Sequence, residues 1–148
     1  MNSTKFILLG MVCVCVLMTT CFSKDEDEES EPKLGKQYKV RYEANLQDSS
    51  KCFMKIDYDK VDVKDYHDIK TINTTANGSW KCELNGYYGY SPMIRATKKS
   101  INNQMNDLEL MNDPTLITVK IYLNDVLVSS ETGTEDAVCY YVIGQGGE

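Results

Sequence analysis

Side chains that could perform catalysis are few in this chain of 148 residues. Nucleophilic catalysis requires a base held beside a Ser or Cys, and the only histidine, His67, lies in the polar stretch of residues 65–68. We interpret His67 as a surface residue. A small hydrolase that uses a pair of carboxylates is the remaining catalytic hypothesis, although small domains rarely offer the cleft that it needs. We therefore predict that the protein is not an enzyme and has no catalytic residues.

An acidic cluster raises the question of a metal site. Crowded oxygen ligands are typical of calcium loops, and the densest acidic set comprises Asp57, Asp59, Asp62, Asp65 and Asp68. Its spacing matches no calcium loop, it lacks the glycine of such loops, and four lysines lie among or beside it. We predict a solvated strand and loop with no metal and no cofactor, and calcium binding is the alternative.

Three tyrosines form the best candidate for recognition. Tyr87, Tyr88 and Tyr90 follow the Asn-Gly pair at residues 85–86. On a loop, such rings stack on sugars or proteins while their hydroxyls stay in water. The alternative is that the tyrosines pack on their own sheet. They are the candidate ligand-binding residues, for an unknown glycan or protein partner.

The N-terminal residues resemble a bacterial lipoprotein signal. Lys5 precedes thirteen residues without a polar side chain, 6–18, which is the length of a secretory signal core and too short to span a bilayer comfortably. Cys21 follows this core after Thr19 and Thr20, as in a lipobox, although Thr20 is larger than the usual Gly or Ala. We predict a signal peptide at residues 1–20 and lipid attachment at Cys21, which would bind the protein to a membrane.

The segment after Cys21 is strongly acidic. Residues 25–31 hold six of the 22 acidic residues of the chain, whose net charge is −6. Together with Ser23 and Lys24, they resemble the export signal of surface lipoproteins in Bacteroidetes-type bacteria. We expect a disordered acidic tether at residues 21–35 and an outer-membrane lipoprotein exposed at the cell surface. Plain cleavage near Ser23 and an uncleaved signal anchor are the alternatives.

The charge and the cysteines of residues 36–148 narrow the possible functions and disulfide pairings. No basic stripe occurs in residues 36–148, which argues against nucleic-acid binding. Three cysteines of this region, Cys52, Cys82 and Cys139, allow three pairings outside the cytoplasm. Since Cys52 and Cys82 both fall on apparent inward positions, we predict a disulfide between them.

Period-2 alternation predicts strands throughout residues 36–148. Residues 117–123 and 126–128 alternate around Asn124-Asp125, which predicts a β-hairpin, and residues 137–143 predict a third strand beside it. Further strands are predicted at 38–43, 52–58 and 80–84, the last of which enters a second hairpin through the turn at 85–86. Trp80 is expected to be the largest core anchor.

The other segments are harder to assign. Residues 73–79 have the composition of a loop, and residues 100–114 fit either a short amphipathic helix or an irregular connection. Turn signals every 8 to 12 residues and very little helix predict an all-β fold. We expect residues 36–148 to form one two-layer antiparallel, immunoglobulin-like β-sandwich of about seven strands.

The predicted strands resemble the extracytoplasmic domain of the mycobacterial membrane-protein-small family, MmpS, and similar small immunoglobulin-like lipoproteins of Bacteroidetes. The resemblance rests on Tyr38, Tyr42, Glu43, Ile56, Asp57, Tyr58, Asp59, Trp80, Ala96, residues 117–128 and Cys139. It implies a β-sandwich and, for MmpS-like proteins, an accessory role to an envelope transporter. Ser79 replaces the proline of the family pattern, Asn124-Asp125 replaces its Asp-Gly turn, and its penultimate-strand cysteine is missing, so its disulfide is not carried over.

Together these features predict a non-enzymatic, lipid-anchored lipoprotein of the cell envelope that acts as a binding or interaction module. An accessory subunit of an envelope transporter is the alternative that the family resemblance suggests. The expected partners are the membrane, through the lipid anchor, and an unidentified glycan or protein.

Overall fold

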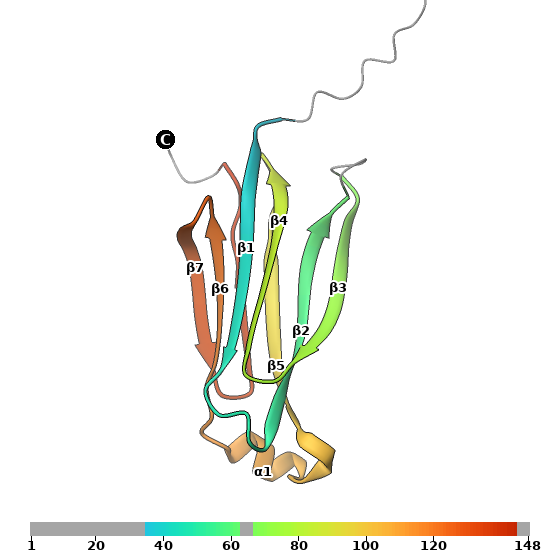
Figure 1. Ribbon diagram of the computed structural model, residues 1–148, viewed down its shortest axis with the longest axis vertical. Coiled ribbons are helices and arrows are strands. Elements are labelled where there is room, and N and C mark those ends of the chain that lie inside the picture. The colour runs from blue at the N-terminus through green and yellow to red at the C-terminus, as the bar shows by residue number, and fades with distance from the viewer. Residues whose placement is uncertain (1–34, 63–66, 145–148) are drawn as a thin grey trace, which may run out of the picture. The chain divides into compact units, whose positions relative to one another are not determined.

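Alternation of apolar and polar side chains builds strands along most of the chain in this computed structural model, which describes residues 35–62 and 67–144. These residues form eight strands and two short helices (Figure 1). The strands are β1 (Gln37–Leu46), β2 (Cys52–Val61), β3 (Ile69–Ala76), β4 (Ser79–Tyr87), β5 (Met93–Ser100), β6 (Ile117–Leu123), β7 (Val126–Gly133) and β8 (Asp136–Tyr140), and the helices are η1 (Ile101–Asn103) and α1 (Asp107–Asn112).

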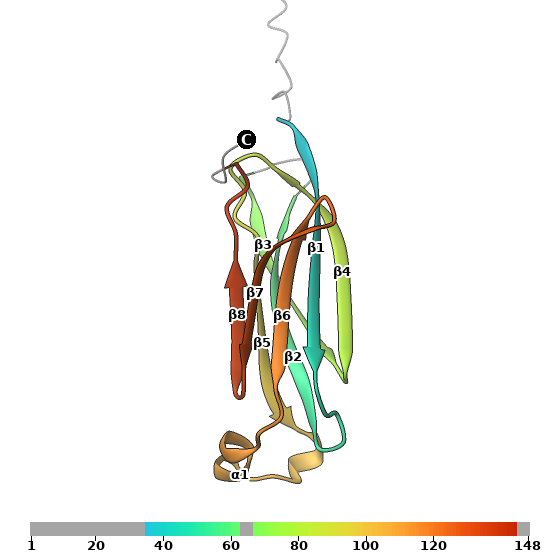
Figure 2. The ribbon, with the colours of Figure 1, turned by 90° about the vertical axis from the view of Figure 1, so that its left-hand side faces the viewer.

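The strands form two four-stranded antiparallel sheets. Sheet A has the strand order β4-β1-β6-β7 and sheet B the order β3-β2-β5-β8. Figure 2 gives a second view, in which the helices lie beyond one end of the strands. The predicted all-β, two-layer antiparallel sandwich is confirmed, with eight strands in place of about seven.

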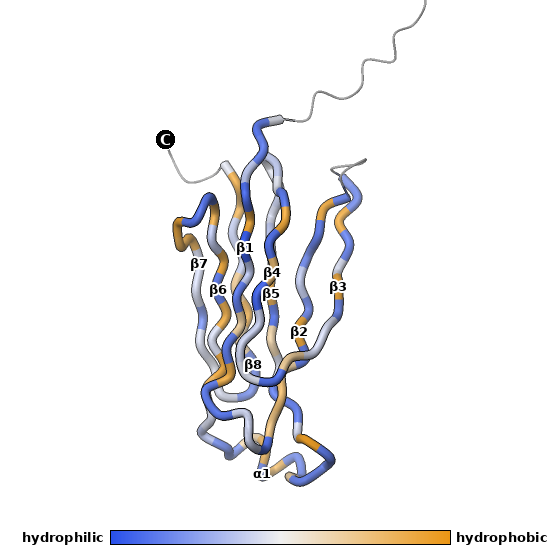
Figure 3. The backbone as a smooth tube through the Cα atoms, in the orientation of Figure 1, coloured by the Kyte–Doolittle hydropathy of each residue, from blue (hydrophilic) through white to orange (hydrophobic). Residues whose placement is uncertain are grey.

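The core lies between the sheets, where each strand places every second side chain. Along β1, Val40, Tyr42, Ala44 and Leu46 are buried, whereas the residues between them face outward. Figure 3 shows this alternation along β1 and β6. Burying one large aliphatic side chain contributes about 1.5–3 kcal/mol. The buried set also includes Met54, Ile56, Ile94, Ile117, Val119, Ile121 and Ile143.

The hairpin predicted at Asn124-Asp125 is present. Both residues have positive φ, 49° for Asn124 and 67° for Asp125, as a two-residue turn matched to strand twist requires. The Asn124 side chain stabilises the turn, because its Oδ1 accepts a hydrogen bond from the backbone N–H of Lys39 at 2.9 Å. The hairpin is thereby attached to β1.

The third strand of this region lies elsewhere than predicted. β8 pairs with β5 in sheet B and does not extend the sheet of the hairpin. Residues 134–135 carry the chain from one sheet to the other. Gly133 permits this crossing, since a Cβ there would overlap the carbonyl oxygen of Asp136. The apolar character of the segment was thus recognised correctly, but its sheet was wrong.

The predicted second hairpin does not form. β4 continues through Asn85 and Gly86 and pairs with β1, whereas β5 belongs to the other sheet. Gly86 is buried, and a Cβ at this position would lie 2.8 Å from Val40 Cγ2 and 2.9 Å from Ile143 Cδ1. Glycine is therefore present for close packing, and the turn comes later, at Gly89, which has a φ of 83°.

The segment predicted as a loop at residues 73–79 is largely strand. β3 runs to Ala76 and pairs with β2 along its whole length. β-branched residues such as Ile72, Thr74 and Thr75 favour a strand, and this preference prevails over the asparagines. Only the Asn77-Gly78 pair turns, with a φ of 89° at Gly78. This edge strand is the additional strand that the prediction lacked.

Residues 100–114 combine the two alternatives that the sequence left open, a short helix and irregular backbone. α1 begins with a capping box, in which Asn106 Oδ1 accepts from the N–H of Glu109 and Glu109 accepts from the N–H of Asn106. The segment is held to the sandwich by Lys98, whose side chain is 1% exposed. Lys98 Nζ donates to the backbone carbonyl of Asp113 at 2.7 Å and lies 3.3 Å from its carboxylate.

Candidate functional site

The three candidate tyrosines do not form a common surface. Tyr87 and Tyr90 are 6% and 4% exposed and belong to the core, whereas Tyr88 is 66% exposed. The ring of Tyr88 lies against Gly144, where a Cβ would come within 2.8 Å of its ring atoms. For Tyr87 and Tyr90 the structure therefore agrees with the packing alternative, and Tyr88 alone has a face that a ligand can reach.

Tyr90 takes part in a buried network of hydroxyl groups. Its OH lies 3.0 Å from the OH of Tyr42, and each hydroxyl lies within 2.9 Å of the backbone carbonyl oxygen of Asp59. β5 pairs with β2 only from Cys52 to Tyr58, so this carbonyl lies just beyond that ladder. Desolvation raises the pKa of both tyrosines well above the ordinary range. They are neutral hydrogen-bond donors that join the two sheets.

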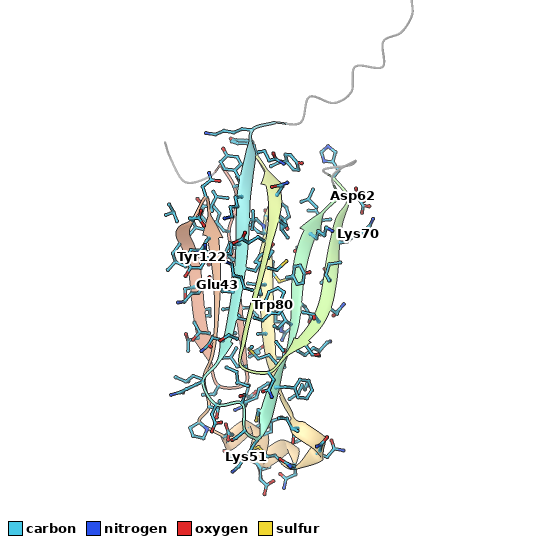
Figure 4. The ribbon with its side chains drawn as sticks, in the orientation of Figure 1. Glu43, Lys51, Asp62, Lys70, Trp80 and Tyr122 are labelled. Carbon is cyan, nitrogen blue, oxygen red and sulfur yellow. The ribbon has the colours of Figure 1, made fainter. Side chains whose placement is uncertain are left out.

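Trp80 lies at the margin of the core and is not its central anchor. Its ring centroid is 5.1 Å from that of Tyr58, and it is only partly buried (Figure 4). Cys82 and Leu84, the next inward residues of β4, are also half-buried. The sheets contact each other chiefly through β5, β6, β7 and β8. The sandwich is therefore packed less closely along its β3–β4 side.

The predicted disulfide is not formed. Cys52, Cys82 and Cys139 are free thiols. Cys52 Sγ lies 3.8 Å from Met105 Sδ, near the helical end of sheet B, whereas Cys82 pairs with Tyr42 in the middle of sheet A. Both positions do face inward, but strand alternation alone does not show how far along the sandwich a residue lies. The prediction of a disulfide between Cys52 and Cys82 was therefore wrong.

The acidic cluster is divided by the fold. Asp57 and Asp59 lie on β2, where Asp59 Oδ1 accepts from the Thr71 hydroxyl at 2.9 Å. Asp62 and Asp68 lie 3.2 and 2.9 Å from Lys70 Nζ, and Figure 4 labels Asp62 and Lys70 at this end of β2 and β3. Asp65 lies outside the described residues, and His67 is exposed. Within residues 35–62 and 67–144, no three His, Cys, Asp or Glu side chains are grouped as metal ligands.

A shallow hollow on the outer face of sheet B is the candidate site. It has a volume of about 520 Å³ and lies over the neighbouring strands β3, β2 and β5. Strand register brings its side chains together, because Phe53 is opposite Lys99 and Lys55 is opposite Thr75. We call it the basic hollow. It is lined by Phe53, Lys55, Asn73, Thr74, Thr75 and Lys99.

The residues of the basic hollow supply groups of the kinds that bind ligands. Phe53 supplies an aromatic surface, Asn73 and Thr75 supply polar groups, and the two lysines supply positive charge. Among the six lining residues there is no nucleophile paired with a base. The sequence contained one signal for this site, which is that Phe53 occupies an outward position of β2 between two inward residues.

The described residues form an eight-stranded β-sandwich with an open, basic hollow on the outer face of sheet B. No protein-family model, no curated protein and no solved structure matches the chain. The resemblance to MmpS-like proteins therefore stays a prediction. Neither helix in the described part of the chain is long and apolar enough to cross a membrane.

Proposed function

We propose that the protein is a non-enzymatic binding module, held at the bacterial cell envelope by a lipid on Cys21 and exposed at the cell surface. The observation that carries the binding role is the basic hollow, in which an aromatic ring, amide and hydroxyl groups and two lysines gather on one sheet face. The sandwich supports this role, since a packed two-sheet core holds such a face in a fixed geometry.

The anchor is supported by the sequence of residues 1–29. Metabolic labelling with an alkyne fatty acid in a bacterium that processes lipoproteins tests it. We expect label on the wild-type chain and at least a tenfold loss in Cys21→Ser, whereas Cys82→Ser keeps the label. An unlabelled wild-type chain would contradict the anchor.

Surface exposure is tested on intact cells, and binding is tested on isolated envelopes. Protease added outside should degrade the protein while a periplasmic control protein stays intact. The chain from Phe22 onward, which contains every core residue of the described part of the chain, should bind to isolated envelopes. If it instead co-purifies reproducibly with an inner-membrane exporter, the accessory role to a transporter replaces the binding module. Full protection from protease would contradict surface display.

A further inference from the structure

The basic hollow has a charge opposite to that of the protein as a whole. The chain carries a net charge of −6, yet the lining contains two lysines and no carboxylate. Lys55 forms a loose ion pair with Asp57, whose Oδ1 lies 3.9 Å from Lys55 Nζ, and the Lys55 side chain is 49% exposed. Lys99 forms no ion pair within the described part of the chain. This face therefore keeps one loosely paired cation and one unpaired cation available.

Three cations on the opposite face of the sandwich are more closely paired than Lys55. On sheet A, Arg41 lies 2.7 Å from Asp125, and Lys81 and Lys39 lie 3.0 and 3.5 Å from Glu83. Arg41 also stacks on the ring of Tyr122 at 4.0 Å. These contacts satisfy the charges within the protein. These three cations are therefore closely paired within the protein, whereas Lys55 of the basic hollow is only loosely paired and Lys99 forms no ion pair in the described part of the chain.

The side chains beside the two lysines indicate the chemistry of the ligand. Phe53 stands opposite Lys99 and two residues from Lys55, so it is a neighbour of both lysines on this face of the sheet. An aromatic face binds the apolar face of a sugar ring, while lysines bind carboxylate or sulfate groups as point charges. Asn73 and Thr75 can hydrogen-bond to hydroxyl groups. A sugar ring that carries an acidic group satisfies all of these side chains at once.

The shape of the basic hollow favours a polymer over a small molecule. Sites for small molecules usually enclose most of the ligand, whereas this site is a shallow depression on an open sheet face. Two lysines are also few for nucleic acid, whose binding depends on many phosphate contacts. A segment of a longer acidic glycan can lie across the strands and continue beyond them.

We infer that the basic hollow binds an acidic polysaccharide, through stacking on Phe53 and ion pairing with Lys55 and Lys99. This inference rests on the proposed binding function and specifies the ligand class of the same site.

Affinity electrophoresis tests it with the chain from Phe22 onward. Native gels contain polygalacturonate, dextran sulfate or neutral dextran. We expect the acidic polymers to retard the protein and neutral dextran to leave it unaffected. Lys55→Gln/Lys99→Gln should weaken binding at least tenfold. The matched control, Lys39→Gln/Lys81→Gln, has the same net charge and should stay within twofold of wild type.

Two further variants separate binding from folding. Lys55→Arg/Lys99→Arg keeps both charges and should retain binding, whereas Phe53→Ala should weaken it with both lysines present. Thermal melts of each variant verify the fold, and the charge-retaining variant supplies the decisive comparison if the glutamine variant unfolds.

Three results would overturn the inference: no retardation by either acidic polymer, equal losses in the two glutamine variants, or tighter binding to RNA than to the polysaccharides. Any of these leaves the proposed binding module intact if the chain still binds isolated envelopes. Failure to bind envelopes would contradict the module itself.

Discussion

The hydroxyl groups of Tyr42 and Tyr90 lie 3.0 Å apart, and both reach the backbone carbonyl oxygen of Asp59. Tyr42 belongs to sheet A, Asp59 to sheet B, and Tyr90 to the connection between β4 and β5. Two donors thus serve one buried acceptor at the point where the β2–β5 ladder ends. This contact joins both sheets and the connecting loop with a single set of hydrogen bonds.

Because two donors share one acceptor, we expect the loss of either to be partly compensated by the other. Tyr42→Phe and Tyr90→Phe should each lower the free energy of unfolding by about 0.5–1.5 kcal/mol. The double variant should lose more than the sum of the two, since it alone leaves the Asp59 carbonyl unpaired, which adds a further penalty of about 1–3 kcal/mol. Urea unfolding measures all three. Additive losses would show that the hydroxyls act independently.

The same pair predicts instability at high pH. Desolvation raises the pKa of Tyr42 and Tyr90 in the folded state, while an unfolded tyrosine ionises near pH 10. The stability is therefore fully present below about pH 10 and is lost as pH rises above it, by up to about 1.4 kcal/mol per pH unit for each group. Urea midpoints between pH 8 and 11 should fall more steeply for wild type than for Tyr42→Phe/Tyr90→Phe. Tyr88→Phe, at an exposed position, should match wild type.

Local alternation was sufficient to predict most strands, because one side of each strand faces a single core. β1 and β6 show this, as their buried residues recur at every second position without interruption. The Asn124-Asp125 turn was equally predictable from the sequence, since two adjacent residues that tolerate positive φ give a local signal. The fold class follows from these short-range features.

Which strands pair with each other was harder to predict from the sequence, because strand pairing depends on long-range packing. Gly86 carries the signature of a hairpin turn in the sequence, but it serves the close approach of Val40 and Ile143, which are far away in the chain. The basic hollow was missed for the same reason. Phe53, Asn73 and Lys99 are separated in sequence and become neighbours only when β3, β2 and β5 align.

The three free cysteines should differ strongly in reactivity. Cys52 and Cys139 are buried, and burial raises the pKa of the Cys139 thiol to about 11. Cys82 is half-buried on the less closely packed β4. Iodoacetamide labelling of the chain from Phe22 onward, followed by mass spectrometry, should modify Cys82 at least about 100-fold faster than the other two. In urea all three should react, and Cys82→Ser should leave only slow sites in the folded protein. Rapid native labelling of Cys52 would contradict the packing of its end of the sandwich.

The buried contact between Lys98 and Asp113 should be asymmetric in its contribution to stability. Asp113→Ala leaves the ammonium group, which is 1% exposed, without its counter-charge, and should lower the free energy of unfolding by about 2–4 kcal/mol. Lys98→Met removes the charge but keeps the volume. It should lose less than about 1.5 kcal/mol, because the Asp113 carboxylate still accepts from the N–H of Thr115 at 2.9 Å. Lys70→Ala, at an exposed ion pair, should leave the urea midpoint close to that of wild type.

The loss of stability at acidic pH provides an independent measurement of the contact between Lys98 and Asp113. Hydrogen bonds from Thr115 and then Lys98 hold the pKa of Asp113 below its usual range. The contribution is therefore present above about pH 4, where an unfolded aspartate is ionised, and is lost as pH falls through the lower folded value. Urea midpoints should fall between about pH 4 and pH 2, and Asp113→Asn should fall less steeply there because it does not titrate. If the urea midpoints of Asp113→Asn and wild type fall in parallel, other carboxylates determine the loss of stability at acidic pH. Asp113 then contributes only through its neutral hydrogen bonds.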